Sequence, residues 1–244
     1  MAGHSKWANI KHKKAAADAK KGKVFTKIIR EITVAAKMGG SDLSSNSRLR
    51  LACEKALSNN MPKDNIDRAI KKGSGANDSS SFENITYEGY GIDGVAVMIN
   101  CLTDNKIRTV ADIRHIFSKN GGNLGTSGSV SHLFEHCGFM LIDQTTSEDE
   151  LIELTLNFDI INIIKDDNDN LELTCKPDTS FYDVKKSLKD ASVEILFSDI
   201  IYKPLSTVEL KKDSEEKLIA MLDAFENHDD VQDVTSNANL SDEF

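Results

Sequence analysis

The sequence predicts an α+β protein, made of an N-terminal three-helix module plus two ferredoxin-like α/β-sandwich domains. Its 244 residues are enough for two or three domains. Helical periodicity runs from Val24 to Lys72, whereas strand-like and helix-like segments alternate beyond residue 82. The polar stretch GSGANDSSS at residues 73–81 separates the two regions and has the composition of a flexible linker.

Three amphipathic segments make up the predicted helical module. The first carries an apolar stripe from Val24 onward and ends at Gly39-Gly40. The second covers residues 48–59, and the third begins at Pro62 and ends at Gly73, the residue types that suit a helix start and a helix end. Residues 1–22 have few large apolar side chains, so we expect them to order on a partner.

The region after the linker reads first as strands at 85–90 and 95–102 and a helix at 107–120. From residue 130 to 203 the order is strand, helix, strand, strand, helix, strand, which is the split βαβ arrangement of a ferredoxin-like domain. The first helix of that unit opens with a capping box from Ser147 to Glu150.

A last helix and a short strand around 231–234 follow, and they are too small to form a core alone. We therefore expect residues 206–236 to return to the sheet begun after the linker. The predicted domains are 1–78, a discontinuous domain made of 79–129 and 206–244, and an inserted domain at 130–205.

Charge is strongly segregated along the chain. Residues 1–75 contain 17 basic and 6 acidic residues, net +11, whereas the other 169 residues carry net −20, for a total of −9. Clustered lysine and arginine side chains neutralise phosphates and release counterions, so the basic module predicts a nucleic-acid partner. The acidic remainder is either solubilising, or repels nucleic acid, or docks a basic surface such as a ribosomal protein.

The candidate nucleic-acid contacts are basic and aromatic residues of the module. Lysines act as mobile charges for phosphates, and a tryptophan stacks on a base or ribose. The alternative is a solvated surface with the tryptophan as a core anchor. The N-terminal candidates are Lys6, Trp7, Lys11, His12, Lys13, Lys14, Lys20, Lys21, Lys23, Lys27 and Arg30. The candidates on the third helix are Lys63, Arg68, Lys71 and Lys72.

The N-terminus of the third helix fits either a phosphate site or an ordinary helix start. Its N-terminus exposes amides that favour phosphate oxygens. Asp64 and Asp67 satisfy the same helix dipole without any ligand, so an ordinary helix start fits the sequence as well. Because the N-terminal basic run holds only Arg30 beside its lysines, we expect little direct reading of bases from it.

Other classes of function find little support. The four cysteines, Cys53, Cys101, Cys137 and Cys175, have no paired spacing, which fits free thiols and predicts no metal or disulfide. The glycine-rich segment 119–128 follows a helix and lacks Gly-Lys-Ser/Thr, so it predicts a connection and not a nucleotide site. His132 and His136 have no evident catalytic partner. We expect no enzyme activity, no cofactor and no membrane span, and a monomer in the cytoplasm.

The residues also carry a family resemblance. The opening Ala2-Gly3-His4-Ser5-Lys6-Trp7-Ala8-Asn9-Ile10-Lys11-His12-Lys13-Lys14 resembles that of the YebC/PmpR family. Further similar motifs lie at 25–32, 60–66, 87–91, 102–105 and 108–130, so the resemblance covers nearly the full chain. Ile92-Asp93-Gly94 lacks a proline often present there, and Glu135-His136-Cys137-Gly138 lacks a frequent basic pair.

The resemblance implies a three-domain cytoplasmic protein that acts as a DNA-binding transcriptional regulator. It also implies an alternative. Mitochondrial relatives resemble translational activators of cytochrome c oxidase synthesis, and bacterial relatives have been connected with ribosomes stalled on proline-rich stretches. Both readings need a module that binds nucleic acid, either DNA or the rRNA or tRNA of a ribosome.

Overall fold

The computed structural model describes residues 21–75, 82–166 and 168–240. These residues form two compact units. One comprises the described residues up to 130 together with 210–236, and the other comprises the described residues of 131–209 and 237–240. The chain therefore leaves the first unit, builds the second, and returns.

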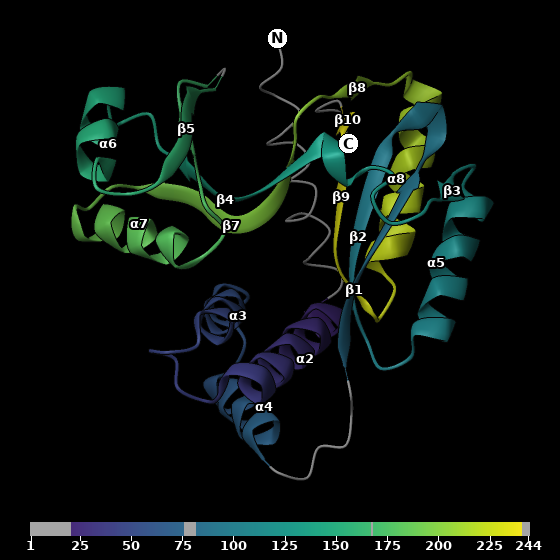
Figure 1. Ribbon diagram of the computed structural model, residues 1–244, viewed down its shortest axis with the longest axis horizontal. Coiled ribbons are helices and arrows are strands. Elements are labelled where there is room, and N and C mark those ends of the chain that lie inside the picture. Colours follow the sequence, from purple (N-terminus) through teal and green to yellow (C-terminus); the bar gives the residue numbers. More distant parts are fainter. Residues whose placement is uncertain (1–20, 76–81, 167, 241–244) are drawn as a thin grey trace. The chain divides into compact units, whose positions relative to one another are not determined.

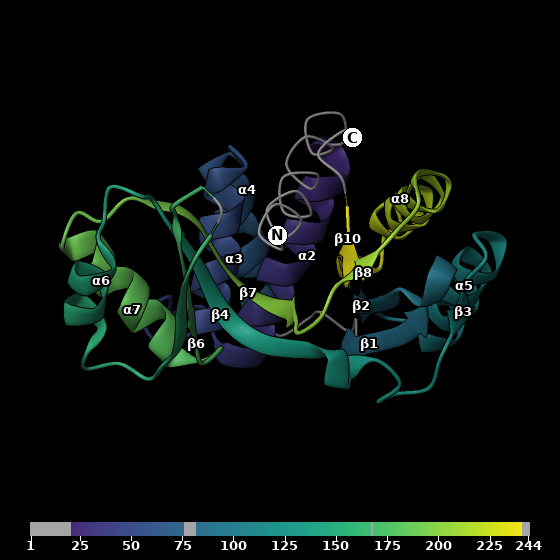
Figure 2. The same cartoon turned by 90° about the horizontal axis from the view of Figure 1, so that it is seen from above.

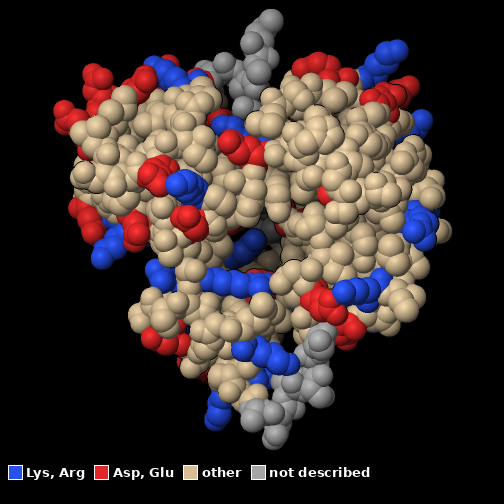
Figure 3. All heavy atoms as spheres, viewed as in Figure 1, with Lys and Arg blue, Asp and Glu red and all other residues tan. Residues whose placement is uncertain are grey.

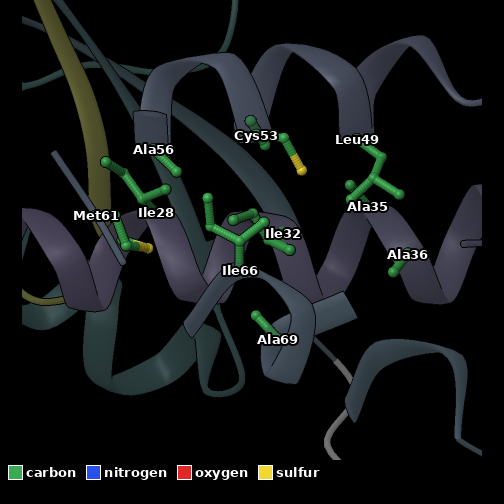
Figure 4. Packing of buried hydrophobic residues seen from close by; sticks show 11 residues of the cluster. Ile28, Ile32, Ala35, Ala36, Leu49, Cys53, Ala56, Met61, Ile66 and Ala69 are labelled. Carbon is green, nitrogen blue, oxygen red and sulfur yellow. The ribbon is translucent and has the colours of Figure 1, made fainter. Parts of the chain in front are cut away.

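The helical module consists of α2 (Lys21–Gly39), α3 (Ser47–Ser58) and α4 (Lys63–Ser74). Its core is a cluster of aliphatic side chains from all three helices, including Ile32 of α2, Leu49 of α3 and Ile66 of α4 (Figure 4). Burial of these stripes is what makes three short helices stable together. The predicted three-helix module is confirmed.

Two contacts hold α3 and α4 close to α2. Asn46 caps α3 by accepting a hydrogen bond from the amide of Leu49, and its side-chain amide donates to the carbonyls of Ala35 (2.8 Å) and Gly40 (2.7 Å). One buried side chain thus joins the end of α2 to the start of α3. On α4, Gly73 lies so close to α2 that a Cβ there would be 2.1 Å from the carbonyl oxygen of Thr33.

The first sheet has the strand order β3-β1-β2-β9, with every neighbouring pair antiparallel. Its elements are β1 (Glu83–Tyr90), η2 (Ile92–Gly94), β2 (Ala96–Thr103), α5 (Lys106–Lys119), β3 (Asn123–Leu124), α8 (Lys212–Glu226) and β9 (Val231–Ser236). Helices α5 and α8 lie side by side on one face (Figure 1). Their contact includes Phe117 and Phe225, with ring centroids 4.8 Å apart.

Strand β9 pairs with β2 along residues 231–236, so the C-terminal helix and strand complete this sheet. The sheet begins with a direct β1–β2 hairpin, so it is a two-layer α/β sandwich with a connectivity of its own. The boundaries of the three-domain division stay a prediction, because the described residues cluster into two units.

The second sheet has the order β5-β6-β4-β7, again antiparallel throughout. Its elements are η3 (Ser131–Leu133), β4 (Phe134–Ile142), α6 (Glu148–Thr155), β5 (Ile160–Lys165), β6 (Leu171–Cys175), α7 (Thr179–Asp190) and β7 (Ile195–Pro204). This order is that of a split βαβ unit, as the sequence predicts. The capping box is also present in part, since Ser147 Oγ accepts a hydrogen bond from the amide of Glu150 (3.2 Å).

A small parallel ladder accompanies this unit. It joins β8 (Val208–Glu209) to β10 (Ala238–Asn239) and so brings together the segments that leave and re-enter the unit (Figure 2). The described fold is therefore an α+β arrangement of one helical module and two sheets, in agreement with the fold class predicted from the sequence.

Candidate nucleic-acid interface

Many of the predicted contact residues lie outside the described part of the chain. The candidates in this group are Lys6, Trp7, Lys11, His12, Lys13, Lys14 and Lys20. Lys21 is the first residue of α2. The candidates that the structure describes lie on α2 and α4.

Helix α4 presents an exposed cationic surface. Lys63, Arg68, Lys71 and Lys72 are all exposed, whereas Ile66, Ala69 and Gly73 face the module core. The 3.6-residue period places Arg68, Lys71 and Lys72 away from the core together. Figure 3 shows Lys and Arg side chains over the helical module in the lower part of the view, with some acidic side chains among them.

Acidic side chains on α4 reduce the net positive charge of this surface. Asp64 and Asp67 are exposed on the same helix, and the Arg68 guanidinium donates to the Asp64 carbonyl (3.1 Å) and to the Asn65 side chain. Pro62 at the N-cap offers no side-chain hydrogen bond to the first turn. The helix thus combines four cations and an N-terminus without a side-chain cap, a set of groups that suits phosphate oxygens.

Three predicted contact residues on α2 are engaged inside the protein. Lys23 Nζ donates to the carbonyl of Asn227 (3.2 Å) and Lys27 Nζ to that of Glu226 (2.6 Å). These carbonyls lie at the C-terminal end of α8, where the helix dipole favours a cation. Burial lowers the pKa of Lys27 to about 8, although nearby carboxylates, Glu226 foremost, oppose the shift.

Arg30 completes this stripe, since residues 23, 27 and 30 share one face of α2. Its guanidinium donates to the carbonyls of Leu102 (3.1 Å) and Asp229 (3.0 Å) and to Asp230 Oδ1 (2.9 Å). The three side chains therefore attach α2 to the first sheet and α8. The charges of Lys27 and Arg30 thus already have partners within the fold, and their role in contacting nucleic acid stays a prediction.

Asp230 is the centre of this attachment. Its side chain is only 4% exposed, and Oδ2 accepts hydrogen bonds from Arg108 (2.7 Å), Thr109 (2.8 Å) and Thr103 (3.1 Å). Burial alone would raise the pKa of Asp230, but the hydrogen bonds from Arg108, Thr109 and Arg30 outweigh it and lower the pKa to about 2. One carboxylate thus joins α2, β2, α5 and the turn before β9.

A polar pocket of about 570 Å³ opens beside this network. It is lined by Lys23, Arg30, Asp104, Arg108, Asp112, Asn227, His228, Asp229 and Asp230. His228 connects its walls, because Nδ1 accepts from the amide of Asp230 (3.1 Å) and Nε2 lies 3.2 Å from Asp112 Oδ2. With four aspartates against three permanent cations, the pocket suits a structural ion network better than a phosphate.

His136 and three of the cysteines are packed against other residues or buried. His136 stacks on Tyr202 with ring centroids 4.6 Å apart, and partial burial lowers its pKa. Burial raises the pKa of the thiols of Cys101 and Cys175 to about 12 and that of Cys137 to about 11, so these thiols are unreactive. Within the described ranges no group of three histidine, cysteine or acidic residues fits a metal ion. The same residues include no helix that is long and apolar enough to cross a membrane.

Fold and site together define a class of protein: a cationic three-helix module with exposed lysine and arginine side chains on α4, followed by two α/β sheets. Models of the TACO1/YebC family match both parts of the chain. The N-terminal-domain model covers residues 5–76, and the model of the second and third domain covers residues 82–238. This chain belongs to the TACO1/YebC family.

Curated relatives support the same assignment. A protein of Cupriavidus necator, described as a probable transcriptional regulatory protein, is 52% identical over 242 residues, 99% of this chain and 100% of the relative. A probable transcriptional regulatory protein of Nitrosomonas eutropha is 53% identical over 240 residues, 98% of this chain and 99% of the relative. The crystal structure of a conserved hypothetical protein of Aquifex aeolicus is similar with a TM-score of 0.77 at 41% identity, covering 93% of each chain.

Proposed function

We propose that this chain is a non-enzymatic nucleic-acid-binding regulator of gene expression that acts in the cytoplasm as a DNA-binding transcriptional regulator. The observation that carries the proposal is the exposed cationic surface of α4 on a module whose sequence is net +11 through residue 75. The descriptions of the curated relatives agree with regulation of transcription.

The proposed interface comprises Lys63, Arg68, Lys71 and Lys72 together with the N-terminal basic run. Four phosphate contacts on a DNA duplex lower the logarithm of affinity by about 3 to 4 per tenfold rise in salt. Three of the four cations are lysines, which neutralise phosphates as point charges and seldom read bases. Sequence selectivity then has to come from further contacts or from the shape of the DNA.

The excess of lysine over arginine on α4 favours a second candidate function. In it, the protein is a ribosome-associated translation factor that binds rRNA or tRNA and relieves stalling on proline-rich sequences. Structured RNA is recognised largely by its shape and its backbone, so a lysine-rich helix with interleaved aspartates suffices there. The exposed surface of α4 fits either polymer, and the two functions differ in the nucleic acid that competes best for it.

The test is co-sedimentation with ribosomes and, in parallel, binding to a random DNA duplex, each across a salt series. The variant Lys63→Ala, Arg68→Ala, Lys71→Ala, Lys72→Ala removes the α4 cations. Its control, Lys186→Ala, Lys189→Ala, Lys211→Ala, Lys217→Ala, removes four exposed lysines outside the module. We expect the α4 variant to bind more weakly with a flatter salt dependence, and the control variant to bind as the wild type does.

Each outcome assigns the function. Sequence-dependent duplex binding without ribosome association supports the transcriptional regulator. Retention on ribosomes at salt concentrations where duplex binding is lost supports the translation factor. Equal binding by the wild type and the α4 variant on both substrates would exclude this helix from the interface.

A further inference from the structure

The loop from Gly125 to Val130 is held by a buried carboxylate. Glu88 lies within β1 and is only 5% exposed. Its Oε1 accepts a hydrogen bond from the amide of Gly128 (2.8 Å), and its Oε2 accepts one from the amide of Val130 (2.8 Å). A single side chain therefore fixes the second half of the loop.

Two more hydrogen bonds to residues of β1 hold Gly125 and Ser129 of the loop. The amide of Gly125 donates to the carbonyl of Glu88 (2.8 Å), and the hydroxyl of Tyr90 donates to the carbonyl of Ser129 (2.8 Å). Within the loop, the amide of Ser129 donates to the carbonyl of Thr126 (3.1 Å), which closes a turn. Both ends and the middle of the loop are thus anchored.

The two glycines of this Gly-Thr-Ser-Gly sequence suit the loop for different reasons. A Cβ on Gly125 would lie 2.5 Å from Ser129 Oγ, so a side chain there would require the Ser129 hydroxyl to move. Gly128 has φ +85°, a conformation that other residues rarely adopt. Between them, Thr126 and Ser127 are exposed and point no apolar group into the core.

Burying a carboxylate is costly unless it is fully hydrogen-bonded. A connection between β3 and the next unit needs no such device, because the tip residues of the loop contribute nothing to the core. What Glu88 adds is a fixed conformation for an exposed polar tip. Fixed, exposed loops are typical of binding surfaces, because a preorganised contact loses less entropy when its ligand arrives.

We propose that the loop Gly125-Thr126-Ser127-Gly128 binds the phosphate and sugar backbone of the nucleic acid. This inference rests on the proposed function and adds a second contact point to it. The tip offers only hydroxyls and main-chain amides, which are among the usual donors to phosphate oxygens. Gly-x-x-Gly loops clamp the nucleic-acid backbone in KH domains, where glycines allow the close approach of the two backbones.

The contacts of β1 place the loop at one end of the first sheet and the helical module at the other. Arg48 of α3 donates to the side chain of Asn84 (3.1 Å), near the start of β1, whereas Glu88 and Tyr90 hold the loop near its end. Four to six strand residues at about 3.4 Å each separate the two points by roughly 15–20 Å. A nucleic acid that contacts both has to extend along the length of β1, about four to six base pairs.

The test uses the full-length ¹⁵N-labelled chain, titrated with a 20-base-pair DNA duplex and, separately, with a 20-nucleotide single-stranded RNA. We expect the amide signals of Thr126, Ser127 and Gly128 to shift together with those of Arg68 and Lys71 with one of these probes. The variant Thr126→Asp, Ser127→Asp removes both hydroxyls and places two negative charges at the tip, so it should bind about tenfold more weakly because the carboxylates also repel phosphates.

The matched control is Gln144→Asp, Thr145→Asp, which adds the same charge at another exposed turn and should weaken binding much less than the loop variant does. The variant Thr126→Ala, Ser127→Ala guards against misfolding, because it removes only the hydroxyls and should weaken binding by a smaller factor. Shifts confined to α4 with both probes would overturn the loop inference while leaving the proposed function in place. Equal weakening by the loop and control variants would also overturn it. Absence of binding by the wild type would contradict the proposed function itself.

Discussion

At the scale of single residues, Asp230 links Arg30 of the helical module to residues of β2 and α5. Its carboxylate accepts hydrogen bonds from Arg30, Arg108, Thr103 and Thr109. Asp230→Asn keeps the size but loses the charge, which leaves two guanidinium groups poorly paired. We expect a loss of about 3 kcal/mol in the free energy of unfolding, measured by urea denaturation at pH 7. Asp229→Asn, at the exposed neighbour that uses only its backbone carbonyl here, should change it little.

Lys27 makes a second residue-scale prediction, on pH dependence. Because burial lowers its folded-state pKa to about 8, below the unfolded value of 10.5, the folded state disfavours the bound proton. The unfolded chain then binds more protons between these pH values, so this group makes stability rise with pH from about 8 to 10.5. Lys27→Met removes that rise. The free energy of unfolding of Lys27→Met relative to wild type should fall by about 2 kcal/mol from pH 7 to pH 9.5.

The control for this pH series is Lys72→Met, which removes an exposed lysine of α4 and so shows what the loss of a lysine charge does by itself. A difference for Lys27→Met that stays constant with pH would show that Lys27 titrates as it does in the unfolded chain.

At the scale of elements, the packing of α2 on α4 depends on Gly73. A glycine inside a helix normally costs stability relative to alanine, so Gly→Ala usually stabilises. Here the added methyl group would lie 2.1 Å from the Thr33 carbonyl oxygen and push the helices apart. Gly73→Ala should therefore destabilise the protein by about 2 kcal/mol in urea unfolding. The matched change Gly22→Ala, in α2 with no atom within 4 Å, should be neutral or stabilising, and a stabilised Gly73→Ala would contradict the packing.

The helices and strands also show which features of the fold can be predicted from sequence patterns. Periodicity predicts α2, α3 and α4 and the split βαβ order, because burial of one face determines both. It cannot tell which partner a charged face meets. Lys23, Lys27 and Arg30 read as one set with the N-terminal lysines, yet they donate to main-chain carbonyls at and just after the C-terminal end of α8, about 200 residues away. The i, i+4, i+7 spacing of these three was a signal for a shared face, but its partner depends on tertiary packing.

The loop at 125–130 shows the same limit. Glycines in the sequence predict a connection there, and the structure agrees. The anchor Glu88 lies about 40 residues earlier in a strand, where an acidic residue reads as an exposed position. A buried carboxylate that hydrogen-bonds loop amides is visible only once β1 and the loop are brought together.

At the scale of the whole molecule, charge segregation determines which part of the surface a polyanion meets. The exposed cations of the described module include Lys63, Arg68, Lys71 and Lys72 of α4, whereas residues 131–209 carry 17 acidic and 6 basic side chains, net −11. We expect such an acidic unit to repel phosphates and to limit non-specific binding by other surfaces. Reducing its charge should therefore strengthen sequence-independent binding.

The variant Glu153→Gln, Asp183→Asn, Asp190→Asn tests this, since all three side chains are exposed. We expect severalfold tighter binding to a random duplex in 0.05 M salt, measured by fluorescence anisotropy. The difference should disappear near 0.5 M, because the range of electrostatic interactions shortens from about 10 Å at 0.1 M toward 3 Å at 1 M. Asn157→Gln, a neutral exchange on the same unit, is the control. Unchanged affinity of the triple variant at low salt would mean that the acidic unit does not steer nucleic acid, and its charge would then serve solubility or a basic protein partner instead.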